Sequence, residues 1–409
     1  MHVLYILGQG EGGLAHYTAE LANAVAVDHE VTVLKPDETD ADSHFDDAVE
    51  VVGAFSPINI SMPRIHTLDL NPLEAIRGLR SYTAIDRVFD IDPDVVHDAS
   101  GLFPQVRLYT ARHGVDEAYP VVVTKHEVPA TRFSLSRPAV TIEESINRLL
   151  PSIDTGAHVV HTPSQSEALA SQGVDPEQIS VIPHGAYSLF GSADDFARSA
   201  EPNTLLFFGN VVPPKGADTL VEAMPRVRER VPDATLIVAG AGTLPSAAQS
   251  ILESHPDAFE RLDYYVPDEA VGELFARAEV VVTPYRDQGG TKGHSGALST
   301  AFSFGKPVVS STAGDFPRLV GERGCGRVVP PDDPERLADA IVDVLTDDEA
   351  RARMAERSAE MSEVLSWERV AEEHVSLYED AIASASSSHA AGRPAGRGPS
   401  VTRTDTTGQ

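Results

Sequence analysis

Cysteine is almost absent from the chain, because its 409 residues include only Cys325. A single cysteine excludes an intramolecular disulfide framework and any multi-cysteine metal site, which suits a reducing cytoplasm. Long apolar runs are absent too, since none approaches the roughly 20 residues that a membrane-spanning helix needs. The N-terminus leads straight into an apolar run without a charged segment before it. We therefore expect a cytoplasmic protein without a secretory signal.

Positive charge is scarce, and lysine especially so. The chain has 32 Lys+Arg against 62 Asp+Glu, a formal net charge of −30, with lysine only at positions 35, 125, 215, 292 and 306. A protein this acidic is a poor partner for nucleic acid or for a broad anionic lipid surface, because both favour basic proteins. Lysine scarcity and Asp-rich turns together predict a halophilic protein, since molar salt screens carboxylate repulsion over about 3 Å. An acidic surface that only aids solubility is the alternative.

Short β-branched runs alternate with amphipathic stretches, which predicts α/β architecture with parallel sheets covered on both faces. We expect strands at 2–7, 31–34, 95–97, 121–125, 158–161 and 179–182, and again at 205–208, 235–239, 263–266, 280–284 and 307–310. Helical spacing of apolar residues marks 14–27, 219–230, 297–304 and 367–383. The pattern starts again after a polar, turn-rich stretch at 188–203, so the chain divides into two consecutive α/β units.

These observations give a division into four parts. We expect a Rossmann-like domain over 1–190, a second over 200–366, a closing helix over 367–384 and a disordered tail over 385–409. The tail is rich in Ser, Ala, Gly, Arg and Thr and has no apolar periodicity.

Three glycine-containing loops are candidates for phosphate binding. The glycines at positions 8, 10 and 13 satisfy G-x-G-x-x-G between a predicted strand and a predicted helix, the context of a dinucleotide fingerprint. A nicotinamide-dependent oxidoreductase would also need an acidic residue at the end of the second strand. The chain has Lys35 there, with Asp37 two residues later. A flexible loop between two domains explains Gly12 and Gly13 equally well, so both interpretations stay open.

The second loop follows the strand predicted at 205–208 and contains Gly209, Asn210 and Lys215. A lysine in a chain that avoids lysine is a candidate cation for a phosphate, against which its compact ammonium can lie. A solvated loop lysine is the alternative.

The third loop precedes a helix that begins near Ser295, Gly296 and Ala297. Exposed N–H groups at a helix N-terminus bind anions, and Lys292 or His294 can add charge. The alternative is an ordinary loop with a capped helix. Ligands of open parallel sheets bind at the carboxyl ends of the strands, so we expect the second and third loops to converge on a diphosphate. Lysines 215, 292 and 306 would then lie in or beside this site.

Several segments, in order, resemble the retaining glycosyltransferases of family 4, with the two-domain GT-B fold, over about residues 1–384. The segments are "GEGGLAHYTAELANAVA", "PDVVHDAS", "VVVTKHEVPA", "HTPSQSEALASQGVDPEQISVIPHGAY", "FFGNVVPPKGADTLVEAM", "LIVAGAGTL", "YYVPDEAVGELFARAEVVVTPY", "GKPVVSS" and "LSWERVAEEHVSLYEDAI". Each segment alone is unspecific, but the ordered set is specific. The resemblance implies an acceptor domain, then a donor domain, and a last helix that crosses back onto the acceptor domain.

The resemblance also implies an activity: transfer of a sugar from a nucleotide-sugar donor with retained anomeric configuration, no cofactor and no essential metal. His126 matches the family's active-site histidine, which would contact the transferred sugar; a buried structural histidine is the alternative. Gly12 and Gly13 would line the cleft near the phosphates and the acceptor. Val266 falls where backbone groups would meet the base.

The chain departs from the family's pattern in two respects. Asn210 stands where the family commonly has arginine, and the usual pair of glutamates is replaced by Lys292 and Thr300. Thr300 can offer the ribose one hydrogen bond, but it lacks the charge that makes such a bond worth about 1.5–3 kcal/mol. A subgroup with "SG" at this helix and "PHG.Y" at the hinge is matched at 295–296 and 183–187. If the chain is similar to this subgroup, the resemblance implies that backbone amides and Lys292 bind the phosphates in place of the arginine.

The acceptor is open: glycan, glycolipid and polyprenyl-linked acceptors all fit. A lipid-linked acceptor would require weak peripheral contact with the inner face of the membrane, for which the amphipathic stretch at 131–150 is a candidate. The favoured alternative for this stretch is a wall of the cleft or the core of the acceptor domain. The leading alternative function is a non-catalytic GT-B-fold partner of another transferase, because the glutamate pair is missing. A nicotinamide-dependent oxidoreductase is the second alternative.

Overall fold

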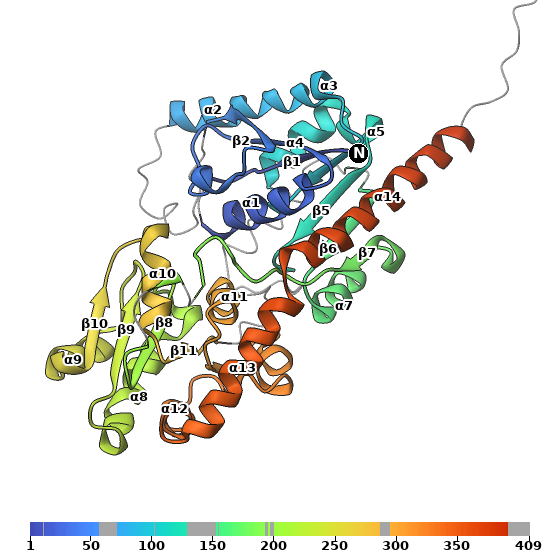
Figure 1. Cartoon of the computed structure of the whole chain (residues 1–409). Coiled ribbons are helices and arrows are strands. Elements are labelled where there is room, and N and C mark those ends of the chain that lie inside the picture. The colour runs from blue at the N-terminus through green and yellow to red at the C-terminus, as the bar shows by residue number, and fades with distance from the viewer. Residues whose placement is uncertain are drawn as a thin grey trace, which may run out of the picture.

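The protein consists of two parallel β-sheets, each with helices on both faces (Figure 1). The computed structural model describes residues 1–10, 12–56, 72–101, 103–128, 153, 155–192, 195–196, 200–286 and 295–391. Figure 1 shows the first sheet with its helices in the upper part of the molecule and the second sheet below it.

The first sheet has seven strands in the described residues, all paired in parallel. Their order across the sheet is β3 (Val49–Phe55), β2 (Glu30–Pro36), β1 (His2–Ile6), β4 (Val95–Asp98), β5 (Val121–Lys125), β6 (Ala157–Val160) and β7 (Ile179–Val181). The helices of this part are α1 (Gly13–Ala26), α2 (Pro72–Ser81), α3 (Val88–Ile91), α4 (Pro104–His113), α5 (Val115–Ala118) and α7 (Pro163–Ser171).

The second sheet has six parallel strands in the described residues. Their order is β10 (Phe259–Leu262), β9 (Thr235–Ala239), β8 (Thr204–Phe208), β11 (Val280–Thr283), β12 (Val308–Ser311) and β13 (Gly326–Val329). Its helices are α8 (Ala217–Arg230), α9 (Ser246–Ser254), α10 (Asp268–Arg277), α11 (Gly296–Ser303), α12 (Pro334–Thr346) and α13 (Asp348–Val364). The fold class predicted from the sequence is confirmed.

Local chemistry explains these elements. Central strands such as β4, β6 and β11 are buried along their whole length, as expected for parallel strands covered on both faces. In α12, the side chain of Asp333 accepts a hydrogen bond from Arg336 N, and Pro334 occupies the first turn. Leu337 and Ile341 of α12 lie one turn apart and both face the core.

The last helix, α14 (Trp367–Ala391), packs on α1 and reaches β4 and β5 of the first sheet (Figure 1). Buried hydrogen bonds attach it there: the Tyr378 hydroxyl lies 2.7 Å from His97 Nδ1 and 3.1 Å from the Tyr5 hydroxyl. The hydroxyl of Tyr17 donates to Nε2 of His374 at 3.3 Å. The predicted crossing of the last helix back onto the first domain is therefore confirmed.

The strand predicted at 263–266 is wrong. The β10 strand is Phe259–Leu262, and Tyr264 and Tyr265 behind it are exposed. The two adjacent tyrosines have a high strand propensity, which favoured the wrong prediction. The charged Arg261 breaks the apolar pattern of β10, so this strand was not predicted. The edge strands β3 and β13 were not predicted. The first is largely exposed, and two of the four residues of the second are not buried.

The last helix also runs seven residues past its predicted end at 384, into the predicted tail. Alanine is the best helix former, and two serines of this stretch satisfy their hydroxyls on the helix itself. Ser386 Oγ donates to Ile382 O and Ser387 Oγ to Ala383 O. Residues 392–409 of the predicted tail lie outside the described residues, and the boundary expected near 190–203 stays a prediction.

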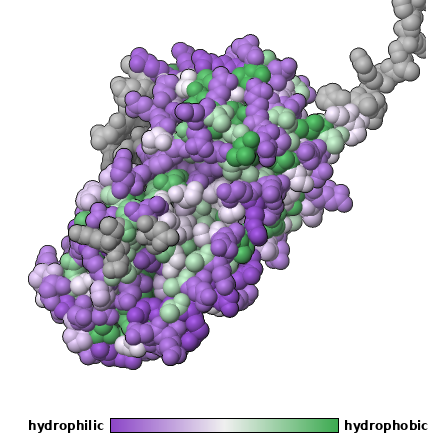
Figure 2. All heavy atoms as spheres, in the orientation of Figure 1, coloured by the Kyte–Doolittle hydropathy of each residue, from purple (hydrophilic) through white to green (hydrophobic). Residues whose placement is uncertain are grey.

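The face shown in Figure 2 is mostly hydrophilic, with small separate hydrophobic spots. Within the described part of the chain, no helix combines the length and hydropathy that a membrane crossing requires. The amphipathic stretch at 131–150, expected as a candidate for membrane contact, lies outside the described residues.

Candidate active site

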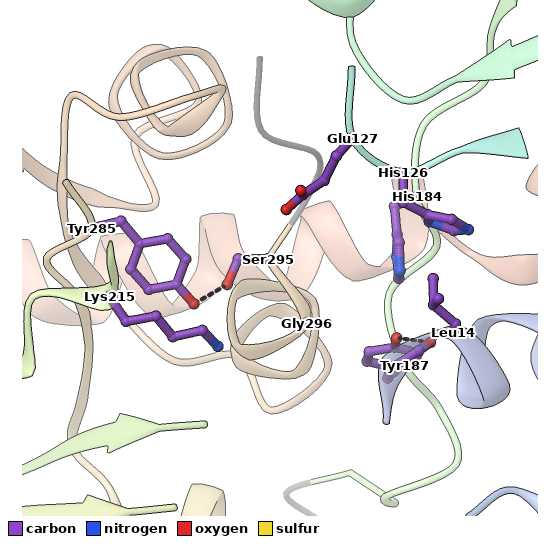
Figure 3. A pocket seen from close by; sticks show the side chains of 10 residues that line it. Leu14, His126, Glu127, His184, Tyr187, Lys215, Tyr285, Ser295 and Gly296 are labelled. Carbon is purple, nitrogen blue, oxygen red and sulfur yellow. Dashed lines mark hydrogen bonds between the residues drawn. The ribbon is translucent and has the colours of Figure 1, made fainter. Parts of the chain in front are cut away.

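A pocket of about 280 Å³ lies where loops of the two sheets face each other (Figure 3). The second sheet contributes Lys215, Tyr285, Ser295 and Gly296, and the first contributes Gly13, Leu14, His126 and Glu127. The connection between β7 and β8 contributes His184 and Tyr187. The residues of both sheets follow the carboxyl ends of β1, β5, β8 and β11, where open parallel sheets bind ligands.

Lys215 supplies a positive charge on one side of the pocket. It ends the short 3-10 helix η6 (Pro213–Lys215), and its Nζ lies 5.4 Å from the centre of the Tyr285 ring, within cation–π range. No carboxylate in the described part of the chain pairs with it in an ion pair. Gly209 leaves the space that this side chain occupies, because a Cβ at Gly209 would lie 2.7 Å from Lys215 Nζ. The lysine charge is therefore available to an anion in the pocket.

The N-terminus of α11 lies beside Lys215 in the pocket (Figure 3). The Ser295 hydroxyl is 2.8 Å from the hydroxyl of Tyr285, which fixes the orientation of both groups. Ser295 O accepts from Leu298 N and Ser299 N, so the helix begins directly behind it. N–H groups of a first helical turn have no acceptor within the helix, so this end can bind an anion.

The sequence predicted several other residues for the donor side, and the structure places them outside the pocket lining. Asn210 is exposed, Val266 is buried in the core, and Ala297 is buried behind the helix start. Thr300 is buried as well, and its hydroxyl donates to Gly296 O at 2.9 Å, so its hydrogen is not available to a ribose in this arrangement. Lys292 lies outside the described residues.

The placement of Lys306 in or beside the donor site is wrong. Lys306 precedes β12, whereas the pocket lies at the carboxyl ends of the strands. Its Nζ donates to Ala276 O at 3.1 Å, and burial lowers its pKa to about 8. Lys306 therefore stabilises the opposite end of the second sheet.

His126 lies on the other side of the pocket, and each of its ring nitrogens lies within hydrogen-bond distance of a polar atom. Its Nε2 donates to Ala99 O at 2.8 Å, and its Nδ1 lies 3.0 Å from Nε2 of His161. His161 in turn donates from Nδ1 to Ile182 O at 3.0 Å. Both carbonyls can only accept, so both outer nitrogens carry hydrogens. A hydrogen bond between the two inner nitrogens then needs one proton more than two neutral imidazoles have.

Burial opposes that extra proton, because it lowers the pKa of His126 to about 4. The pKa of His161 is also lowered by burial and by the nearby His126 and His184. A negative charge in the pocket acts in the opposite direction, since it favours a charged imidazole. The rings of Tyr17 and His126 pack in a T-shaped arrangement with their centres 4.7 Å apart, which fixes the imidazole in place. His126 thus has a fixed orientation in the pocket, and its burial favours the neutral imidazole.

The glycine loop connects the two sides of the pocket. Gly13 lines the pocket, and its carbonyl accepts a hydrogen bond from the Tyr187 hydroxyl at 3.0 Å. Gly12 does not line it; its N–H donates to Asp40 Oδ2 at 2.7 Å, and its φ of 72° suits glycine. Close by, Glu20 accepts from Ser188 N and Leu189 N in the connection between the sheets. The first helix and the hinge are therefore held together next to the pocket.

Four residues of the site were not singled out from the sequence. Tyr285 directly follows the expected strand at 280–284, so the rule that ligands bind at strand ends could have found it. Leu14 and Glu127 adjoin predicted site residues. His161 has no such signal, because its role comes only from its contact with His126, 35 residues away.

Two family models match the chain: "Glycosyltransferase Family 4" over residues 11–186 and "Glycosyl transferases group 1" over residues 202–347. An MMP alpha-(1->4)-mannosyltransferase of Mycolicibacterium hassiacum is 30% identical over 71% of this chain and 72% of its own length. A D-inositol 3-phosphate glycosyltransferase of Corynebacterium glutamicum is 28% identical over 64% of this chain and 67% of its own length.

Among solved structures, HepE of Anabaena in complex with UDP superposes with a TM-score of 0.66. It shares 16% sequence identity, and the match covers 93% of this chain and 100% of that chain. This likeness shows the GT-B fold. With the two family models and the mannosyltransferase relative, it leads to one assignment: the chain belongs to the group 1 glycosyltransferases of family 4.

Proposed function

We propose that the protein transfers a sugar from a nucleoside diphosphate sugar to a glycan, glycolipid or polyprenyl-linked acceptor in the pocket between the two sheets. The observation that carries the proposal is the opposition of two kinds of groups across this pocket. Lys215 and the start of α11 at Ser295 and Gly296 lie on one side, and His126 lies on the other. The first side suits a diphosphate and the second suits the sugar attached to it.

Each group has a role in this proposal. Lys215 and the first N–H groups of α11 stabilise the negative charge that grows on the leaving diphosphate. His126, held by Ala99 O and His161, contacts the transferred sugar next to the reacting carbon. Gly13 offers backbone close to the sugar and the acceptor. Closure of the two domains excludes water, which would otherwise hydrolyse the donor.

We further propose that the anomeric configuration is retained, that no metal or cofactor is required, and that the nucleotide sugar is the only co-substrate. The charges that a metal would provide can come from Lys215 and the N-terminus of α11. The name of one relative, a D-inositol 3-phosphate glycosyltransferase, favours a phosphorylated polyol as the acceptor. A lipid-linked acceptor would place the reaction at the inner face of the cell membrane, through weak peripheral contact.

A transfer assay tests this function. Purified protein is incubated in molar KCl with UDP-, GDP- and ADP-sugars, with and without acceptors such as inositol phosphate, and nucleoside diphosphate release is measured. Molar salt is chosen because the acidic surface predicts a halophilic protein. We expect one donor to be consumed, and consumption to fall in both Lys215→Met and His126→Ala. Near-wild-type transfer by both variants would refute the roles assigned to these residues.

A second function is favoured by one specific observation. Thr300 stands in place of a family glutamate, and its hydroxyl donates a hydrogen bond to Gly296 O, which weakens recognition of the ribose. A non-catalytic partner of another transferase would tolerate this loss. Calorimetric titration with UDP, GDP and ADP separates the two functions. A non-catalytic partner binds none of them, or binds one without consuming the corresponding nucleotide sugar.

A further inference from the structure

Three potential metal ligands converge outside the pocket, at the contact between the two halves of the molecule. His16 lies on α1 and His44 ends the 3-10 helix η1 (Asp42–His44), both in the part that carries the first sheet. Asp268 is the first residue of α10, in the part that carries the second sheet. Their ligand atoms, His16 Nε2, His44 Nε2 and a carboxylate oxygen of Asp268, all lie within 4.8 Å of one another.

The two imidazoles point at the same carboxylate oxygen. Nε2 of His16 is 2.8 Å and Nε2 of His44 is 2.9 Å from Oδ2 of Asp268. Zinc takes histidine nitrogen and carboxylate oxygen at about 2.1 Å, so two of its ligands in a tetrahedral arrangement lie about 3.4 Å apart. Moving each nitrogen about 0.5 Å away from the oxygen would open the required space. Small side-chain rotations are therefore enough to admit an ion.

The surroundings suit an ion that is partly shielded from water. The exposed fraction of the side chain is 6% for His16, 18% for His44 and 15% for Asp268. The rings of Tyr187 and Phe190 pack edge-on against His16 and hold its orientation. The remaining exposure of His44 and Asp268 leaves room for water as a fourth ligand.

Charge also favours a cation here. The Asp268 carboxylate can supply a negatively charged oxygen to an ion held beside the two imidazoles. The formal net charge of −30 gives the whole molecule an attraction for cations.

We propose that His16, His44 and Asp268 bind one divalent transition-metal ion of the zinc type, with water completing the coordination. Two imidazoles and one carboxylate are ligands that suit zinc, whereas calcium and magnesium require mainly oxygen. The ligands come from parts of the sequence that are 252 and 224 residues apart, so no local spacing reveals them. The proposal does not depend on the transfer reaction, and the ion takes no part in it.

The position of the ion gives it a consequence for domain closure. An ion that needs ligands from both halves binds only when the halves are together, so it stabilises the closed arrangement. The neighbouring hydrogen bond from the Tyr265 hydroxyl to Asp40 Oδ2, 2.8 Å long, joins the same two halves without any of the three ligands. It provides a matched control for closure without metal binding.

The test uses the full chain after removal of metal by a chelator. Zinc binding is measured by calorimetry, and cobalt is added as a spectroscopic probe, because tetrahedral Co²⁺ has strong visible absorption bands. We expect one tight equivalent of zinc and a tetrahedral cobalt spectrum. Asp268→Asn and His44→Ala should each weaken zinc binding by tenfold or more. The circular dichroism spectra of the metal-free variants should match that of the metal-free wild type, which shows that the variants are folded.

Two control variants make the test specific. His255 is exposed and lies on another part of the surface, so His255→Ala should bind zinc like the wild type. Tyr265→Phe should weaken zinc less than tenfold, because it removes an interdomain contact but no ligand. The proposal is overturned if the wild type binds no zinc, or if the ligand variants and His255→Ala bind it equally.

Discussion

Replacement of Lys215 by methionine tests the donor side of the pocket most sharply. Methionine has a similar length and no charge, so Lys215→Met removes the ammonium while the space next to Gly209 stays filled. A hydrogen bond to a charged group contributes about 1.5–3 kcal/mol, and each 1.4 kcal/mol is a factor of ten. We therefore expect kcat/KM for the donor to fall by roughly 10- to 150-fold.

The division of this loss between kcat and KM shows what the lysine does. If Lys215 stabilises charge that develops on the leaving diphosphate, kcat falls more than KM rises. Lys215→Arg, which keeps the charge, should retain part of the activity. Arg353→Met removes one positive charge from an exposed ion pair with Glu349 and should leave kcat/KM unchanged. A Lys215→Met variant within threefold of the wild type would refute the assignment.

Three further predictions concern pH, the last helix and the loop after β8. Burial lowers the pKa of His374 to about 4, so its contribution to stability is present above pH 6.5 and is lost as the pH falls towards 4. The free energy of unfolding, measured in urea, should change by up to about 1.4 kcal/mol per pH unit through this residue. His374→Gln should remove this contribution, and identical pH slopes in the wild type and the variant would contradict the prediction. Tyr378→Phe leaves Nδ1 of the buried His97 without its hydrogen-bond partner. We expect the free energy of unfolding, measured in urea, to fall by about 1–3 kcal/mol. An unchanged free energy of unfolding would show that α14 is held by packing alone. Gly209→Ala would bring a Cβ to 2.7 Å from Lys215 Nζ, so donor kcat/KM should fall in kinetic assays, and an unchanged value would show that the lysine position is not critical.

The sequence predicted most of the fold because the strands are buried on both faces. Such strands are nearly continuous apolar runs, and β1, β5, β8 and β9 lie where these runs were found. Edge strands lack this pattern, so β3 and β13 were missed. Arg261 interrupts the apolar pattern of β10, and the strand accommodates it because its side chain donates to the carbonyls of Val238 and Gly240. Such a contact depends on the tertiary structure and gives no local pattern.

The site was partly predictable for a related reason. Lys215, Ser295, Gly296, Gly13 and His126 follow strands, and parallel sheets bring the ends of their strands to one edge.

The same rule could have excluded Lys306, since it precedes its strand. The hydrogen bond of His126 to His161, and that of Tyr187 to Gly13, join segments 35 and 174 residues apart. These contacts depend on side-chain packing that a single sequence does not express.

The central claim is sugar transfer with retention in the pocket between the sheets. The most direct test is to follow the reaction of the preferred α-linked nucleotide sugar by proton NMR, with the wild type and Lys215→Met side by side. We predict that the first product signal has the α configuration and that it forms roughly 10- to 150-fold more slowly in the variant. A β product, or donor consumption that is equal in the two proteins, would contradict the account.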